Sequence, residues 1–144
     1  MSFSPGQIIT AQRLNRLAPA TYWAQASGGV AASSSGVDVP GSSMSITVQT
    51  NGATANMWFY GHFYAGASAP TTNGAIQAVW DVNSSPTFGV VDIRTANEKF
   101  TGANSWSTSI PAAGTYTFKL KVTTPANVTM PTYSSLLVQI QEVA

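Results

Sequence analysis

Few residues in this chain have side chains that could catalyse a reaction. The sequence contains one histidine, His62, and five acidic residues. A catalytic triad needs a nucleophile and an orienting acid beside its base, but His62 has no such pattern near it and the Gly-x-Ser-x-Gly elbow is absent. Asp81 and Asp92 could flank a glycosidic bond, although two aspartates on adjacent strands are more often surface charges. The sequence therefore predicts that the chain is not an enzyme.

The acidic residues are also too scattered to suggest a metal site. Such sites gather histidine, cysteine or carboxylate side chains, whereas the acids stand apart at Asp38, Asp81, Asp92, Glu98 and Glu142. The absence of cysteine excludes disulfides, thiol nucleophiles and thiolate ligands. No glycine-rich phosphate loop is present either. We expect neither a metal nor a cofactor.

One segment is suited to binding through aromatic rings. On a strand over residues 56–65, alternation places four ring-bearing side chains on one face: Trp58, Tyr60, His62 and Tyr64. The opposite face would be apolar, so the ring-bearing face must meet another chain, a loop or a ligand. Tryptophan and tyrosine are enriched in subunit interfaces, which favours an oligomer interface, and a glycan stacked on the rings is the alternative. His62 is expected to be a hydrogen-bonded neighbour of these rings.

Alternation of apolar and polar residues predicts an all-β body around this segment. It is regular over residues 43–49, with Met44, Ile46 and Val48 on one face, and over residues 115–122. Less regular strands are predicted over residues 21–26, 56–65, 75–83, 87–95, 105–110 and 134–143. Asn51-Gly52 predicts a hairpin, and residues 28–36 a loop. About eight strands at this spacing predict a β-sandwich or jelly-roll-like domain.

The N-terminal segment predicts a short helical arm ahead of that domain. Thr10 is suited to cap a helix over residues 11–17, with Ile9 and Leu14 at the spacing of a hydrophobic staple. A helix of two turns is marginal alone in water, so it must dock on something. We expect an attachment arm over residues 1–20 and a β-sandwich over residues 21–144. The anchoring side chains would be Ile8, Ile9, Arg13, Leu14, Arg16 and Leu17.

Composition favours a protein fixed among partners. Only 8% of residues are charged, against roughly 25% in an average soluble chain, and the formal net charge is +1. Such a surface gives little colloidal repulsion and is tolerable when much of it is covered. The six basic residues are scattered, which argues against nucleic-acid binding. No apolar run could span a membrane, and no signal peptide is apparent, so we expect assembly in a cytoplasm.

Three short stretches near the two ends of the chain, residues 5–15, 113–118 and 133–138, are similar to segments of virion proteins of tailed bacteriophages. Residues 5–15, Pro-Gly-Gln-Ile-Ile-Thr-Ala-Gln-Arg-Leu-Asn, resemble the openings of tail-fibre, minor tail and head-decoration proteins. Residues 113–118 (Ala-Gly-Thr-Tyr-Thr-Phe) and 133–138 (Tyr-Ser-Ser-Leu-Leu-Val) are similar to the closing strands of small β domains on such virion proteins. The family often ends in a Leu-Leu-Val-Glu-Asp type of run, from which this chain departs.

This resemblance covers about a quarter of the chain and implies a virion structural protein. It implies a homo-oligomer, most commonly a trimer, that decorates the capsid and contacts the major capsid protein or tail proteins. The location would be the virion, assembled in the host cytoplasm. The alternative is a tail-fibre or tail-tip module that binds a host surface glycan through the ring-bearing face.

Overall fold

The computed structural model describes residues 15, 18–31, 33–70, 74–81, 83–85, 88–91, 95–130 and 132–143. These residues form eleven β-strands joined by turns and loops. The strands are β1 (Ala20–Gln25), β2 (Ser33–Asp38), β3 (Met44–Val48), β4 (Ala53–Ala65), β5 (Gly74–Trp80), β6 (Asn83–Ser84), β7 (Phe88–Val91), β8 (Lys99–Ile110), β9 (Gly114–Thr124), β10 (Val128–Thr129) and β11 (Ser135–Gln141).

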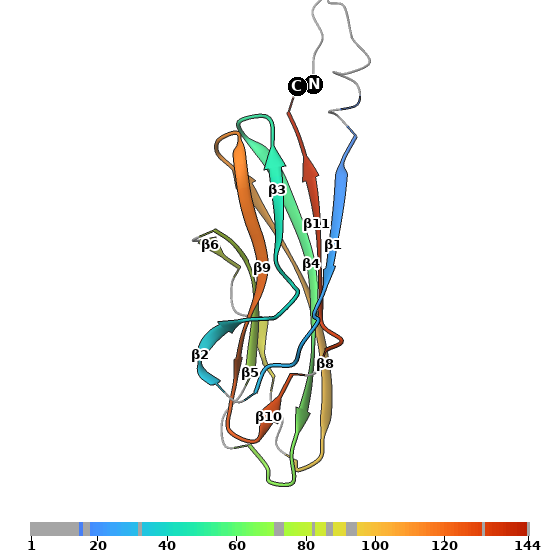
Figure 1. Cartoon of the computed structure of the whole chain (residues 1–144), viewed down its shortest axis with the longest axis vertical. Coiled ribbons are helices and arrows are strands. Elements are labelled where there is room, and N and C mark those ends of the chain that lie inside the picture. Colours follow the sequence, from blue (N-terminus) through green and yellow to red (C-terminus); the bar gives the residue numbers. More distant parts are fainter. Residues whose placement is uncertain are drawn as a thin grey trace, which may run out of the picture.

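The strands pair into two antiparallel sheets that form an elongated sandwich (Figure 1). In the first, called the β4 sheet, β1 pairs with β11, β11 with β4, and β4 with β8. The short β10 pairs with the end of β4 on the same side as β11. In the second, called the β9 sheet, β2 and β3 lie end to end beside β9. The other side of β9 pairs with β5, which in turn pairs with β6 and β7.

The strand order of the sandwich is that of a jelly roll. When strands lying end to end are counted as one, each sheet has four strands, and in chain order these run 1-8-3-6 and 2-7-4-5. The chain therefore passes repeatedly from one sheet to the other, as two Greek keys require. The predicted all-β sandwich is confirmed. The predicted helical arm lies almost entirely outside the described residues.

Alternating burial explains how the two sheets hold together. Along β4 every second residue is buried, from Ala53 to Ala65, and β9 shows the same alternation from Phe118 to Thr124. The inward side chains of both strands meet in one hydrophobic core, together with Ile46 and Val48 of β3. The inward faces predicted for residues 43–49 and 115–122 are confirmed.

Two sequence predictions about connections are wrong. Asn51-Gly52 does form a turn, with Gly52 at φ +76°, but this turn joins β3 of one sheet to β4 of the other rather than closing a hairpin. A local turn signal cannot reveal that the strands on either side have different partners. Residues 28–36 were predicted as a loop, but β2 occupies residues 33–38 and pairs with β9. Its serine-rich sequence lacks the apolar alternation by which a strand is recognised.

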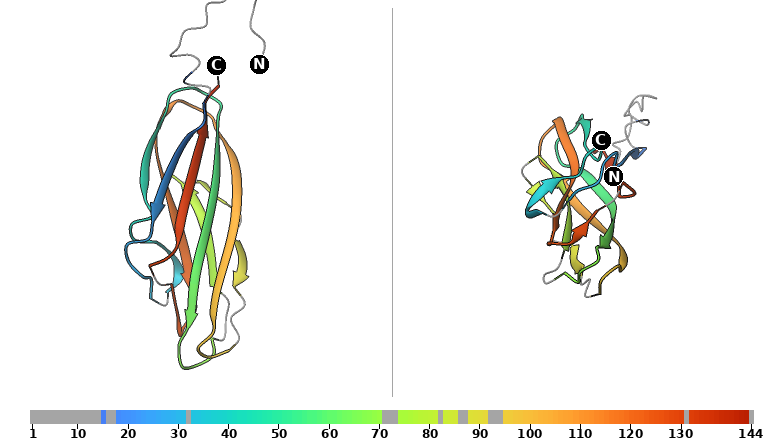
Figure 2. Two further views of the ribbon diagram at one scale, coloured as in Figure 1. Left: turned by 90° about the vertical axis from the view of Figure 1, so that its right-hand side faces the viewer. Right: turned by 60° about the horizontal axis from the view of Figure 1, so that its bottom comes forward.

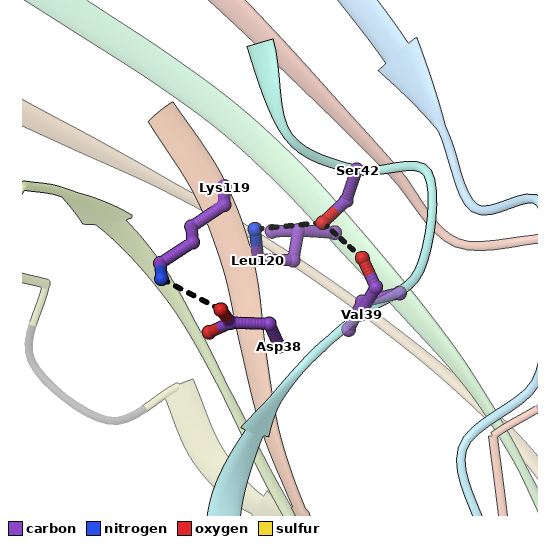
Figure 3. Close-up of polar contacts among 5 residues, drawn as sticks. All are labelled: Asp38, Val39, Ser42, Lys119 and Leu120. Atoms are coloured by element: carbon purple, nitrogen blue, oxygen red, sulfur yellow. Dashed lines mark hydrogen bonds and ion pairs between the residues drawn. The ribbon is translucent and has the colours of Figure 1, made fainter. Parts of the chain in front are cut away.

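A buried serine bridges the break between β2 and β3 (Figure 3). The Ser42 hydroxyl donates to the Val39 carbonyl oxygen at 2.7 Å and accepts from the Leu120 N–H at 3.0 Å. On this side of β9, residues 119 and 120 have no strand residue opposite them, because β2 pairs with residues 121–124 and β3 with residues 114–118. The hydroxyl thus takes the place of the missing backbone partner. Beside it, Lys119 and Asp38 form an exposed ion pair at 2.7 Å.

A carboxylate fastens the two sheets at the end of the sandwich where β11 ends. Glu142 accepts hydrogen bonds from the N–H groups of Gln49 and Thr50 and from the Thr50 hydroxyl. The Thr50 oxygen also accepts from the Val143 N–H at 3.0 Å. This network ties the turn after β3 to the C-terminal end of β11. Within the described ranges, no helix is long and apolar enough to cross a membrane.

Replacing Ser42 with alanine tests the bridge. Ser42 is fully buried, so the S42A variant leaves the Leu120 N–H without a partner, and an unsatisfied buried group costs about 1–3 kcal/mol. We expect the free energy of unfolding, measured by urea denaturation, to fall by that amount. S43A is the matched control, because Ser43 is exposed and its change is expected within about 0.5 kcal/mol of wild type. Equal effects of the two substitutions would contradict the role given to Ser42.

Candidate functional site: the aromatic face of the β4 sheet

The ring-bearing residues predicted from the sequence lie on the outward side of the β4 sheet. Burial along β4 alternates as expected: Met57, Phe59 and Phe63 are in the core, and the intervening residues are not. Trp58 is the most open of the four, at 45% exposed, and the other three are half-buried. Figure 2 (left) looks onto this side, with β1, β11, β4 and β8 next to one another. We call this surface the aromatic face.

The aromatic face contains a groove centred on a row of apolar side chains. Trp23 of β1 is opposite Leu137 of β11, which is opposite Trp58 of β4, so the three align across neighbouring strands. Tyr60 continues the groove along β4. The groove is open and has a volume of about 500 Å³; the rest of its lining is Phe59, Ala103, Asn104, Ser105 and Ser135. Its polar groups are neutral amides and hydroxyls.

Trp23 was not among the residues singled out from the sequence. It is 62% exposed, more than Trp58, and it forms one wall of the groove. A signal was present, because Trp23 lies between Thr21 and Gln25 on the polar side of an alternating strand. The contribution of Leu137 could not be found in this way, since it depends on β11 lying between β1 and β4.

His62 and Tyr64 lie farther along β4, outside the groove lining. The His62 Nδ1 is 2.6 Å from the Thr101 hydroxyl across the β4–β8 pair, and its ring meets Tyr133 edge-on with centroids 6.4 Å apart. The Tyr64 hydroxyl donates to Asn97 Oδ1 at 3.3 Å. His62 was expected to be a hydrogen-bonded neighbour of the other rings on its face, but its side-chain hydrogen bond is with Thr101 and its ring contact is with Tyr133. Of the four ring-bearing residues predicted from the sequence, Trp58 and Tyr60 therefore line the groove, and the other two do not.

The chemistry available in the groove is stacking and neutral hydrogen bonding. No charged side chain is among the described residues that line it, and the described residues hold no cluster of three metal-ligating side chains. The Asp81 carboxylate accepts a hydrogen bond from the Thr117 N–H at 2.8 Å, and Glu142 binds the β3–β4 turn, so both have structural partners. Asp92 lies outside the described residues.

The predicted anchor side chains, from Ile8 to Leu17, also lie outside the described residues. The described chain nevertheless shows where an arm would join the domain. β1 begins at Ala20, opposite Ile140 near the end of β11. A second groove of about 460 Å³ lies at this end, lined by residues that include Ala20, Tyr22 and Glu142.

The described strands form a jelly-roll β-sandwich with an open groove on its aromatic face. No protein-family model matches the chain, and no curated protein matches its sequence. Solved structures do match the fold. They include the VP2 protein of infectious bursal disease virus, which the chain resembles with TM-scores of 0.52 to 0.53 in three structures.

The three VP2 structures are a mutant in derived T=1 particles, the viral particle and a subviral particle. Sequence identity is 10% in the first two and 11% in the third, and 98% of this chain is covered each time. The chain spans about a third of the length of VP2: 36%, 35% and 37% in the same order. At this identity the likeness establishes a shared fold.

A glycine in β4 leaves room for the core side chains behind the aromatic face. Gly61 lies between Tyr60 and His62 and points inward, where an added Cβ would be 2.9 Å from both Ile76 Cδ1 and Phe63 Cε2. We expect G61A to lower the free energy of unfolding by about 1–3 kcal/mol through overpacking.

Gly66, just beyond β4, provides the matched control for G61A. An added Cβ there would have its nearest contact at 3.5 Å, to the Asn127 carbonyl oxygen. G66A is therefore expected to change the free energy of unfolding by no more than about 1 kcal/mol. Urea denaturation measures both variants. A G61A variant as stable as G66A would show that β4 does not need glycine at this position.

Proposed function

We propose that the chain is a structural protein of a virus particle, specifically a capsid decoration (cement) protein of a tailed bacteriophage. The jelly roll is the observation that carries the proposal, because 98% of the chain matches VP2, a protein solved as viral and subviral particles. The bacteriophage class comes from the resemblance of residues 5–15 and of the closing strands. The low charge of the chain suits a protein whose surface is largely covered by neighbours.

Attachment is assigned to the N-terminal arm. Residues 1–20 would bind the major capsid protein, or tail proteins in a tail location, through Ile8, Ile9, Leu14 and Leu17, with Arg13 and Arg16 as polar guides. Because β1 begins at one end of the sandwich, an attachment there leaves both outer faces of the domain accessible. Binding only the assembled lattice would stabilise that lattice by mass action. The proposal includes no nucleic acid, no membrane and no catalytic activity.

The oligomer is proposed to be a trimer in the virion, assembled in the host cytoplasm. Several arms in one oligomer would then bind several capsid sites at once. Multivalent attachment of this kind raises the overall affinity by converting later contacts into intramolecular ones. Individually weak arms would thus suffice to hold the protein on the particle.

A tail-fibre or tail-tip module that binds a host surface glycan is the second candidate function. The groove between Trp23 and Trp58 favours it, because exposed indole rings beside neutral amide and hydroxyl groups are suited to stacking on sugar rings and hydrogen bonding to their hydroxyls. The groove volume of about 500 Å³ also falls in the range of small-ligand sites. On this alternative, each copy would use its groove separately.

Copy number in purified particles distinguishes the two functions. Quantitative mass spectrometry would measure the ratio of this chain to the major capsid protein in virions of the virus that encodes it. A decoration protein is expected at a ratio close to that of the capsid protein, because the lattice repeats its binding site. A handful of copies would instead indicate a tail or vertex component. Absence from the particle would contradict both functions.

Deleting residues 1–18 tests the arm. The deletion ends before β1 begins at Ala20, so the sandwich is expected to fold, with an unchanged β-type far-UV circular dichroism spectrum. Co-sedimentation with particles lacking the native protein should fall to background. A substitution of Ser45, on the outer side of the β9 sheet, is the control and should bind normally. A deletion variant that still decorates particles would overturn the anchor.

A further inference from the structure

The two outer faces of the sandwich differ in chemistry. On the β9 sheet, the outward side chains of β9 are Thr115, Thr117, Lys119 and Lys121, a polar surface with the ion pair to Asp38. The aromatic face of the β4 sheet presents Trp23, Trp58, Tyr60 and half-buried Leu137 instead. The single charged side chain on its described strands is Lys99, at one end of β8. Of the two faces, the aromatic face is therefore the one suited to burial.

The aromatic face is large enough for a stable protein contact. The strands β1, β11, β4 and β8 have 6, 7, 13 and 12 residues. At about 3.3 Å per residue and about 4.8 Å between strands they cover roughly 600 Å². That area lies at the lower end of the range for standard interfaces, about 600 Å² per partner. No other described strand lies in front of this face (Figure 2, left). Exposed tryptophans aligned across three strands at its centre are typical of an interaction site.

One strand at a margin of this face, β8, has no partner on its outer side among the described strands. In the described ranges, β8 pairs with β4 alone, over twelve residues. Long exposed edge strands are usually protected by charges, proline or bulges. β8 has no proline and one charge, Lys99, at its first residue. Ala103, Asn104 and Ser105 of the same strand line the groove, so the unprotected edge and the groove adjoin one another.

We propose that the aromatic face is the contact between copies of this chain, in which the β8 margin of one copy packs into the groove of the next. One such contact covers two exposed features at once, the tryptophan groove and the uncharged strand edge. It joins different surfaces of identical chains, so it is heterologous, and a heterologous contact yields a closed ring when its rotation closes. That the ring has three chains rests on the proposed function. The contact itself is inferred from the aromatic face and the unpaired edge of β8.

The chemistry of the two surfaces is complementary. The groove offers indole and phenol rings with neutral hydrogen-bonding groups, and the β8 margin beyond the groove lining offers small uncharged side chains such as Ser107 and Ser109. Small residues allow a strand to approach aromatic rings closely, and neither surface loses a hydrated charge when they meet. A two-fold contact of groove against groove would leave the β8 edges open. The face-to-edge arrangement is therefore preferred.

A charge placed in the groove tests this contact in the full chain. Ser105 is exposed, lines the groove and lies opposite Trp58, so S105E adds a charge to the contact without removing a core side chain. S45E is the matched control, because Ser45 is also an exposed serine on a strand but lies on the outer side of the β9 sheet. A103E, at the neighbouring exposed groove position, provides a second variant if S105E does not fold.

Molar mass measured by light scattering after size-exclusion chromatography is the first readout. Wild type and S45E are expected at three times the 15.0 kDa chain mass, and S105E or A103E at a threefold lower mass with an unchanged β-type circular dichroism spectrum. Acrylamide quenching of tryptophan fluorescence should rise in the monomeric variants, because Trp23 and Trp58 become accessible. A monomeric wild type, or groove variants that keep the wild-type mass, would overturn the contact.

The outcomes separate this contact from the proposed function. A chain present in virions but monomeric in solution, with host-cell binding lost in W58A, would overturn the copy–copy contact and assign the groove to a glycan. A chain that trimerises through the groove but is absent from virions would support the contact and contradict the virion function. S105E monomers that still bind particles would support the contact between copies. They would also show that attachment does not use the groove, in agreement with attachment through the N-terminal arm.

Discussion

The structure depends on β4, which is paired on both sides and buried on one face. Twelve of its thirteen residues pair with β8 along one side, and β11 and β10 pair with parts of the other side. Burying side chains such as Met57 and Phe63 contributes about 1.5–3 kcal/mol each. That burial determines which residues face out, because a slip of one residue would exchange the two faces. The aromatic face is therefore a consequence of the core: Trp58 is outside because Met57 and Phe59 are inside.

In this jelly roll the chain passes from sheet to sheet, and one strand position beside β9 is divided between β2 and β3. One polar contact holds the chain at that division, and another holds it at a turn between the sheets. Ser42 replaces a backbone partner where the chain breaks between β2 and β3, and Glu142 holds the turn that carries the chain from β3 to β4. Gly41, at φ +77°, belongs to the same break, where a Cβ would meet the Ser27 backbone at 2.6 Å. The buried serine and the glycine set the path of the chain at that point.

The sequence predicted what depends on alternation and missed what depends on pairing. The faces of residues 43–49, 56–65 and 115–122 follow from the period of two and were correct. The hairpin at Asn51-Gly52 was wrong because a turn signal carries no information about the partners of distant strands. Trp58 could be found because it lies in an aromatic run, whereas the row from Trp23 through Leu137 forms only when β11 lies between β1 and β4. Glu142 appeared isolated for the same reason.

The proposed contact between copies would explain both the low charge of the chain and its aromatic face. A free monomer with few charges and exposed indoles would be prone to non-specific association. A contact that buries the groove and the β8 edge removes both hazards, and it leaves the polar outer side of the β9 sheet, with Lys119 and Lys121, in contact with water. Each oligomer would then present lysine and threonine outward and tryptophan inward. The distribution of charge over the two sheets, rather than its total, is what would suit the proposed contact between copies.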